Sequence, residues 1–135
     1  MSVSIERIEG IGPVYTKKLA YAGIKTSKNL LEAGRTRSSR EALAKKLDIP
    51  YKLVLRWVNL ADLIRIKGIS KEYSDLLEEA GVDTVAELSK RSPESLHTKV
   101  LDVNKKKKLV RRSPTLDVVR RWIEHAKKLP RLIEY

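Results

Sequence analysis

Two glycines near the start of the chain, Gly10 and Gly12, flank one apolar residue, Ile11, and a proline follows at once. Glycine permits backbone angles and close approaches that a Cβ atom would block. Proline is favoured at the first position of a helix, and the free N–H groups at a helix start bind anions. The pattern therefore predicts a tight turn whose backbone holds a phosphate oxygen without preference for nucleotide sequence.

Basic residues follow this turn. Lys17 and Lys18 lie about one helical turn beyond it, within reach of flanking phosphates, whereas Glu9 places a negative charge just before it. A Gly-x-Gly turn between helices also occurs as a purely structural feature, so both interpretations stay open for the turn itself. The proline, the lysines, the apolar spacing and the basic chain together favour phosphate binding.

The charge of the whole chain points to a polyanionic partner. Its 135 residues include 29 Lys+Arg and 17 Asp+Glu, which gives a formal net charge of +12. We therefore expect nucleic acid as the partner, with the oligomeric state open. DNA is the favoured nucleic acid, and RNA stays the alternative because charge does not distinguish the two. The chain has no cysteine, no apolar run near the roughly 18 residues of a membrane span and no signal-like N-terminus. These absences predict a cytoplasmic protein without a membrane partner, associated with the nucleoid if the source is prokaryotic.

An internal repeat supplies the elements that position the turn. Residues 8–31 read IEGIGPVYTKKLAYAGIKTSKNLL and residues 66–89 read IKGISKEYSDLLEEAGVDTVAELS, with nine identical positions at an offset of 58. Trp57 and Trp122 correspond at an offset of 65, so the second copy carries a short insertion near Lys105–Pro114. We expect repeat one at 1–60 and repeat two at 61–135, packed as one compact body.

Local signals predict an all-α fold of about eight to ten short helices, because nothing alternates with the period of a strand. Apolar residues at helical spacing, from Leu53 to Ala61, mark a buried helix face around Trp57. The expected helix boundaries are Pro13 to Gly23, Thr26 to Gly34, a capping box of Ser38 and Glu41 for a helix that ends near Leu47, a start at Pro50, and a last helix from Ser113-Pro114 to Pro130.

The segment Ile5-x-x-Ile8-x-Gly10-Ile11-Gly12-Pro13-x-x-Thr16-x-x-Leu19 resembles the helix-hairpin-helix motif. The resemblance implies two tandem repeats of SAM-like, helix-hairpin-helix architecture that contact the sugar-phosphate backbone, sometimes with a monovalent cation held by hairpin carbonyls and with no other cofactor. The AGI-x-T and AGV-x-T segments and the WVN-x-ADL-x-RI joint at 57–66 are similar to an uncharacterised family of tandem helix-hairpin-helix-like domains of unknown function. That similarity covers nearly the whole chain.

Repeat two keeps the repeat's residue spacing but lacks the features that favour phosphate binding. Ser70 replaces the second glycine, and Glu72, Asp75, Glu78 and Glu79 line the helix that follows. Carboxylates repel phosphate, so we expect the second turn to be a structural partner that completes the core.

Two other basic segments are candidates for the same surface. Residues 40–57 resemble a helix-turn-helix in which Lys52, Arg56 and Asn59 share an outer face, although an ordinary helical hairpin is the favoured interpretation. The run Lys105–Lys108 lies in the insertion, where we expect it to contact phosphates or to form a solvated or mobile loop, and the two are compatible because a mobile basic loop can still touch phosphates.

An enzyme is poorly supported, because His97 and His125 are far apart and neither metal-ligand spacing nor a P-loop pattern is present. We expect a non-enzymatic protein that binds DNA through the sugar-phosphate backbone, largely independent of sequence, with no catalytic or metal-ligating residue and no small-molecule substrate. The alternative is a helical protein-interaction or scaffold module with purely structural hairpins. The candidate contact residues are Gly10, Ile11, Gly12, Val14, Lys17, Lys18, Arg40, Lys45, Lys52, Arg56, Lys105, Lys106, Lys107, Lys108, Arg111 and Arg112.

Overall fold

The computed structural model describes residues 2–135, and within that range the protein is all-helical. An isolated bridge between Ser4 and Thr26 is the only strand-like pairing in these residues, so the predicted all-α class is confirmed. None of the described helices is long and apolar enough to cross a membrane. The elements are the short 3-10 helix η1 (Ile5–Arg7), α1 (Pro13–Tyr21), α2 (Ser27–Ala33), α3 (Arg37–Leu47), α4 (Tyr51–Ile64), α5 (Lys71–Glu79), α6 (Val85–Ser89), α7 (Pro93–Lys107) and α8 (Leu116–Lys128).

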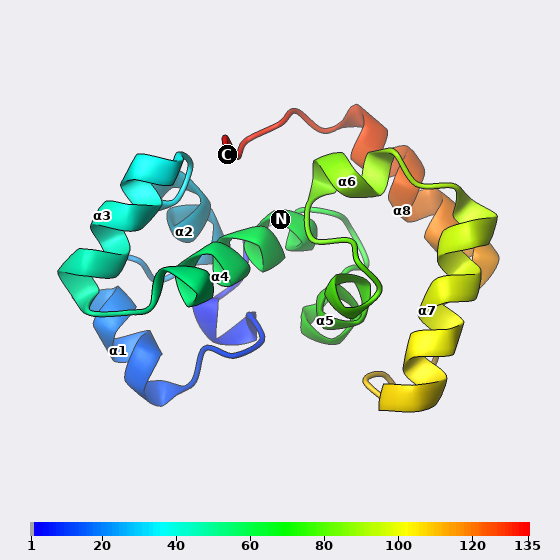
Figure 1. Ribbon diagram of the computed structural model, residues 1–135, viewed down its shortest axis with the longest axis horizontal. Helices are drawn as coiled ribbons and strands as arrows, with labels where there is room; N and C mark the ends of the chain where they lie inside the picture. Colours follow the sequence, from blue (N-terminus) through cyan, green and yellow to red (C-terminus); the bar gives the residue numbers. More distant parts are fainter. Residues whose placement is uncertain (1) are drawn as a thin grey trace.

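The helices form two groups, each around its own buried core (Figure 1). The first group contains η1 to α4, with Leu19, Leu30 and Trp57 fully buried inside it. The second contains α5 to α8, around Leu77 and its neighbours. Helix α4 belongs to both, because residues along its whole length, from Val54 to Ile64, pack into the first core while Leu63 packs into the second.

The two groups repeat the same contacts around one glycine each. Gly10 has φ +91° and Gly68 has φ +93°, a region that side chains disfavour. A Cβ on Gly10 would lie 3.2 Å from Nε1 of Trp57, and a Cβ on Gly68 would lie 3.3 Å from Nε1 of Trp122. The fold thus requires glycine at both positions, and the sequence repeat is also a repeat of these contacts. The matching ring pairs are Tyr15–Trp57, with centroids 4.9 Å apart, and Tyr73–Trp122, with centroids 5.3 Å apart.

Most helix ends agree with the local sequence signals. Helix α1 begins at Pro13 and ends two residues before Gly23. Thr26 caps α2 by accepting the backbone N–H of Asn29 at 3.1 Å, and α2 ends just before Gly34. These short-range signals work because each cap satisfies backbone groups of its own helix.

Two boundaries differ from the expectation. The capping box of α3 consists of Thr36 and Ser39, not Ser38 and Glu41, because Thr36 accepts the Ser39 N–H at 3.1 Å and the Glu41 carboxylate pairs instead with a neighbouring arginine. Helix α8 is capped by Thr115, one residue after the proline expected to open it.

The insertion in repeat two is shared between a helix and a loop. Helix α7 has 15 residues where α3 has 11, and residues 108–115 join α7 to α8 where only 48–50 join α3 to α4. Asn104 holds the longer loop, since its side-chain oxygen accepts the Val110 N–H at 2.9 Å and its side-chain amide donates to the Val110 carbonyl at 3.1 Å. The solvated-loop interpretation is therefore wrong for Lys105–Lys107, which form the last turn of α7.

After α8 the chain returns to the first group as a C-terminal strap, residues 129–135 (Figure 1). Ile133 is buried in the first core. The backbone N–H of Glu134 donates to the carbonyl of Arg35 at 2.8 Å, and the hydroxyl of Tyr135 donates to Oδ1 of Asn59 at 2.8 Å. The strap thus links the end of the second group to the first.

Candidate nucleic-acid interface

The predicted phosphate-binding turn leads directly into α1. Ile11 is buried, and its N–H donates to the carbonyl of Ile8 at 3.2 Å, which closes the turn. Gly12 is the N-cap residue of α1 and offers no side chain to cap it. The first α1 amide with a backbone partner is Thr16, which donates to the Gly12 carbonyl at 2.9 Å. The N–H groups between them have no intrahelical partner, as at any helix start, and lie at the positive end of the helix dipole.

The two glycines of the turn have different roles. Gly10 is required by its positive φ, whereas Gly12 is extended, with φ −90° and ψ −173°. A Cβ on Gly12 would meet no atom within 4 Å. Its counterpart Ser70 carries a side chain with nearly the same backbone, φ −97° and ψ −173°. The fold therefore does not need glycine at position 12, and the missing side chain leaves the backbone open to approach from outside the protein.

An exposed face of α1 adjoins the turn. Val14 is 68% exposed, Tyr21 is 89% exposed and Lys17 is exposed, at a spacing of three and four residues that places them on one side of the helix. Val14 and Lys17 were expected contact residues, whereas sequence reasoning missed Tyr21. Its counterpart in repeat two, Glu79, is a charged and exposed residue, and that correspondence is the signal that marks position 21 as surface.

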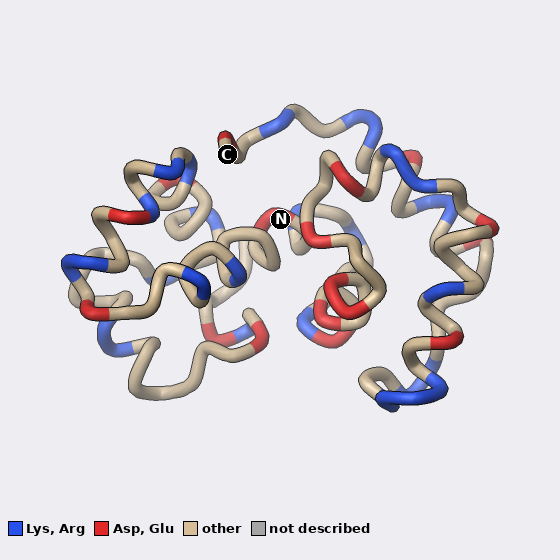
Figure 2. The backbone as a smooth tube through the Cα atoms, viewed as in Figure 1, with Lys and Arg blue, Asp and Glu red and all other residues tan. Residues whose placement is uncertain are grey.

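Further cations lie close to α1. The Nζ atom of Lys18 donates to the carbonyl of Asp48 at 3.2 Å, which places the end of α3 beside α1. Lys45 and Lys46 belong to that last turn of α3, and Lys52 is exposed in the first turn of α4. Basic segments mark the backbone where α3 ends and α4 begins (Figure 2). Lys45, Lys46 and Lys52 form no ion pair within residues 2–135, so their charges are available to an anion, whereas Lys18 is engaged by Asp48.

Arg40 does not belong to this surface, and its expected role as a contact residue is wrong. The residue is 1% exposed. Its guanidinium group donates to the carbonyls of Gly34 at 2.9 Å and Glu134 at 3.0 Å, and to the hydroxyl of Tyr51 at 3.1 Å. Asn59 is buried as well, bonded to the C-terminal strap. The outer face that a helix-turn-helix would need on α4 is therefore not present.

Arg56 is also unavailable to phosphate, for an electrostatic reason. It donates to both carboxylate oxygens of Glu78, at 2.8 and 3.0 Å, and to Asp75 at 3.3 Å. Burial opposes the charge of Arg56, but these carboxylates outweigh it and raise its pKa. Burial raises the pKa of Glu78 and of Asp75. Arg56 thus neutralises acids of repeat two, which contradicts its prediction as a free contact.

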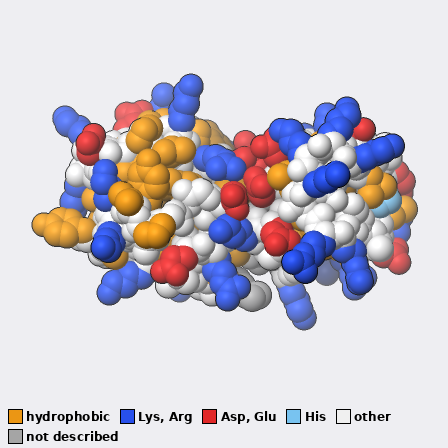
Figure 3. Space-filling view, turned by 90° about the horizontal axis from the view of Figure 1, so that it is seen from below, with side chains coloured by type: hydrophobic (Ala, Val, Ile, Leu, Met, Phe, Trp, Pro, Cys, Tyr) orange, Lys and Arg blue, Asp and Glu red, His pale blue; other side chains and the backbone are white. Residues whose placement is uncertain are grey.

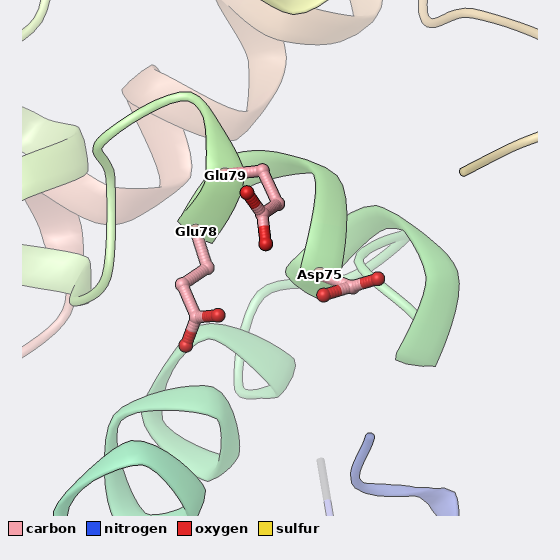
Figure 4. A group of neighbouring side chains, drawn as sticks. All are labelled: Asp75, Glu78 and Glu79. Carbon is pink, nitrogen blue, oxygen red and sulfur yellow. The ribbon is translucent and has the colours of Figure 1, made fainter. Parts of the chain in front are cut away.

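An acidic cluster separates the two groups. Asp75, Glu78 and Glu79 lie on one side of α5 with carboxylate oxygens within 4.8 Å of one another (Figure 4). Arg56 pairs with the first two, and Lys107 pairs with Glu79. Seen from below, acidic side chains gather at the waist between the two basic halves (Figure 3). A nucleic acid bound at α1 therefore meets repulsion, rather than attraction, on the side of α5.

The lysine run is only partly free. Within Lys105–Lys108, Lys106 pairs with Asp102 at 3.3 Å and Lys107 pairs with Glu79. These two ion pairs make the positive potential around the run weaker than the sequence alone would indicate. The basic residues of this segment that are exposed and form no ion pair within residues 2–135 are Lys105, Lys108, Arg111 and Arg112.

The turn is compatible with the monovalent cation that the motif resemblance implies. Such an ion would be held by backbone carbonyls of the turn. The carbonyl of Ile8 already accepts the N–H of Ile11, but a carbonyl oxygen has two lone pairs and one stays free. Glu9, which approaches Lys71 only to 3.9 Å, adds negative charge close by.

A family model described as a domain of unknown function (DUF4332) matches residues 9–129. The matched range contains both glycine turns and all eight described α-helices, from Pro13 to Lys128. No solved structure matches the chain.

Proposed function

The chain belongs to the DUF4332 family of unknown function, and we propose that it binds nucleic acid, DNA first, through the sugar-phosphate backbone and without catalysis. We include in this proposal that its two groups are tandem helix-hairpin-helix repeats and that repeat one supplies the contact. Sequence-independent binding follows from the chemistry, because backbone N–H groups and lysines contact phosphates and not base edges.

The observation that carries the proposal is the unoccupied space around Gly12. Nothing inside the protein explains a glycine there, since the equivalent serine of repeat two adopts the same backbone. A glycine that the fold does not need, at a helix start with free N–H groups, suits a ligand that must approach the main chain closely. A phosphate oxygen is such a ligand.

Lys17 and the cations at the end of α3 would then contact the phosphates on either side. Each phosphate neutralised in duplex DNA releases about one counterion, so the logarithm of the binding constant falls with the logarithm of salt by roughly 0.9 per phosphate. Lys17, Lys45, Lys46 and Lys52 are free to do this, whereas Lys18 already donates to the Asp48 carbonyl. We therefore expect a contact with few phosphates and a correspondingly moderate salt slope.

The test is a titration of labelled duplex and single-stranded DNA at two salt concentrations with the wild-type chain and Gly12→Ser. We expect the serine variant to keep its melting temperature, because Ser70 fits the same backbone, and to lose at least about tenfold in affinity, the value of one hydrogen bond to a charged group. Lys17→Gln should reduce the salt slope by about one, whereas Lys99→Gln, an exposed lysine of α7, serves as the charge-matched control.

Two results would overturn the proposal. One is the absence of binding at low salt. The other is a Gly12→Ser variant that binds as tightly as the wild type, because DNA would then contact another surface of the chain.

A further inference from the structure

Repeat two contains a pocket of about 600 Å³ between its glycine turn, α5 and α8. Lys67 lies on the turn side, Arg121 and His125 line the α8 side, and the rings of Tyr73 and Trp122 form part of the wall. Among the residues that the structure describes, no carboxylate lines the pocket. All the ionisable groups that line it, other than the tyrosine, are thus bases, although α5 beside it carries four acids.

Comparison with repeat one shows how this charge arises. Glu9, before the first turn, corresponds to Lys67 before the second, which reverses the charge. Arg56 corresponds to Arg121, but Arg56 is neutralised by carboxylates whereas Arg121 is exposed and forms no ion pair within residues 2–135. The buried Leu60 corresponds to the half-buried His125. At three equivalent positions, repeat two presents basic groups that repeat one lacks or holds neutralised.

Two of the four acids of α5 are directed away from the pocket. Asp75 and Glu78 bond to Arg56 on the side facing the first group, so they point away from α8. The side of α5 toward the pocket carries Tyr73, whose hydroxyl donates to the carbonyl of Arg112 at 2.9 Å. That bond ties the basic 108–115 loop to the wall of the pocket. Asp75 and Glu78 therefore disfavour phosphate on the face of repeat two toward the first group, and not in the pocket.

We propose that this pocket binds a phosphate ester. The planar guanidinium of Arg121 suits two phosphate oxygens at once, and Lys67 adds a compact positive charge. Nδ1 of His125 accepts the backbone N–H of Lys67 at 3.3 Å, which orients the ring and leaves its other nitrogen to donate. The half-buried ring of Tyr73 offers an apolar wall for the sugar or base that the phosphate carries.

The phosphate can come from a free nucleotide or from a nucleic-acid backbone, and only the second source rests on the proposed function. In that case the chain would hold the backbone at two places, the Gly12 turn and this pocket, on either side of the acidic cluster. Two linked contacts raise the overall affinity above either one alone when a ligand spans both.

The two tryptophans allow each place to be observed separately. Nε1 of Trp57 lies beside Gly10, and Nε1 of Trp122 lies beside Gly68 in the wall of the pocket. Their indole N–H signals in a nitrogen–proton NMR spectrum of the full chain report the first turn and the pocket independently. The probes are adenosine 5′-monophosphate, adenosine as the phosphate-free control, and a short single-stranded oligonucleotide.

We expect the mononucleotide to shift the Trp122 signal and adenosine to leave it unchanged. Arg121→Gln and Lys67→Gln should each weaken this binding by about tenfold, whereas Lys128→Gln, an exposed and unpaired lysine of α8, should not. All three side chains are exposed, so these variants should fold. If the oligonucleotide binds at Trp122 at least about tenfold more tightly than the mononucleotide, the backbone is the ligand, and equal binding identifies the free nucleotide.

An unchanged Trp122 signal at millimolar nucleotide, an equal response to adenosine, or binding that survives Arg121→Gln would overturn the assignment. Its failure is separable from that of the proposed function. If DNA binding is lost in Gly12→Ser while the Trp122 signal does not shift on binding, only the pocket proposal is wrong. If the Trp122 signal shifts while Gly12→Ser has no effect on DNA binding, only the proposed contact at the first turn is wrong.

Discussion

Tyr21 is 89% exposed at the last position of α1, on the same face as Val14 and Lys17. At 1.5 Å per residue, Tyr21 lies about 10 Å along the helix axis from Val14. A strand that binds a phosphate at the start of α1 and follows this face therefore brings a base over the tyrosine ring. Stacking of a base on an aromatic side chain contributes about 1–3 kcal/mol and does not depend on which base it is.

We predict that Tyr21→Ala weakens binding of single-stranded DNA by roughly 5-fold to 150-fold, the equivalent of that stacking energy. Duplex binding should change little, because paired bases do not present their faces. Tyr21→Phe keeps the ring and should bind like the wild type. Fluorescence anisotropy with matched single-stranded and duplex probes measures both, and equal losses on the two probes would show that Tyr21 does not stack.

The residues that sequence patterns placed correctly are those whose partners are near in sequence. Gly10 and Thr26 serve the turn and the cap in which they stand. Arg40 and Asn59 instead bond to the strap, and the acceptor of Arg40 on Glu134 lies 94 residues further along the chain. A surface helix pattern does not reveal such a partner, so both were predicted to be exposed. Arg56 was misjudged for the same reason, since its carboxylates belong to the other repeat.

At the scale of elements, Asp62 joins the end of α4 to the start of α6. Its carboxylate is buried, accepts the backbone N–H of Val85 at 2.8 Å and lies 3.3 Å from Nε of Arg65. Burial raises the pKa of Asp62, assisted by Asp83, while the bond from Val85 and the charge of Arg65 lower it by less. The charge of Asp62 in turn helps to raise the pKa of Tyr135. The net effect penalises the ionised carboxylate in the folded protein.

The sign of the resulting pH dependence follows from linkage. Between the ordinary aspartate pKa of about 4 and its raised value in the fold, the folded state binds more protons than the unfolded state, so the contribution of Asp62 to stability falls as pH rises. We predict that the free energy of unfolding of the wild type, minus that of Asp62→Asn, decreases over this window and is constant above it. Urea denaturation from about pH 4 to about pH 7 measures the difference, and a difference that rises with pH would contradict the prediction.

The element-scale expectations failed where the two repeats differ in length. The correspondence of the tryptophans showed that residues had been inserted, but not that α7 would be lengthened as well as the loop after it. Helix α7 continues to Lys107 because residues 93–107 contain no glycine or internal proline to end it, and Lys108 then adopts the left-handed conformation, φ 52°, as Asp48 does after α3. The backbone N–H of Lys108 donates to the Asn104 carbonyl at 2.8 Å where α7 ends, and the Asn104 side chain holds the loop that follows. Neither contact follows from a regular sequence pattern.

For the molecule as a whole, the net charge of +12 does not describe the surface. Free lysines gather around α1 and the end of α3, free bases gather around the turn and α8 of repeat two, and the acidic cluster lies between them. Composition alone predicts one continuous basic field. The repeat explains why the basic surface is not continuous. Acids of repeat two neutralise Arg56 of repeat one, so an acidic region divides the positive surface into two parts.

The C-terminal strap also links the two groups. Two adjacent apolar residues in it provide a matched test of how much its packing contributes to stability. Ile133 is 3% exposed in the first core, whereas Leu132 is 37% exposed. We predict that Ile133→Ala lowers the free energy of unfolding by about 2–4 kcal/mol, and that Leu132→Ala lowers it by less than about 1 kcal/mol, because only the buried side chain leaves a cavity. Denaturation of both variants gives the two values, and equal losses would show that the strap does not pack as described.

The loss in Ile133→Ala should fall on the first group. The indole N–H signal of Trp57 reports the first core, and that of Trp122 reports the second. In Ile133→Ala the Trp57 signal should disappear at a lower denaturant concentration than the Trp122 signal, whereas in the wild type the two should disappear together.

Tyr135 provides an independent readout, because burial, followed by the charges of Asp83 and Asp62, raises its pKa to about 12. A strap released by Ile133→Ala separates the phenol from Asn59 and from the carboxylates of Asp83 and Asp62, so its absorbance change on ionisation should move down toward the ordinary tyrosine value of about 10. Tyr135→Phe lacks this late ionisation and identifies the signal, and a late ionisation that persists unchanged in Ile133→Ala would mean that Asn59 holds the strap in place without the isoleucine.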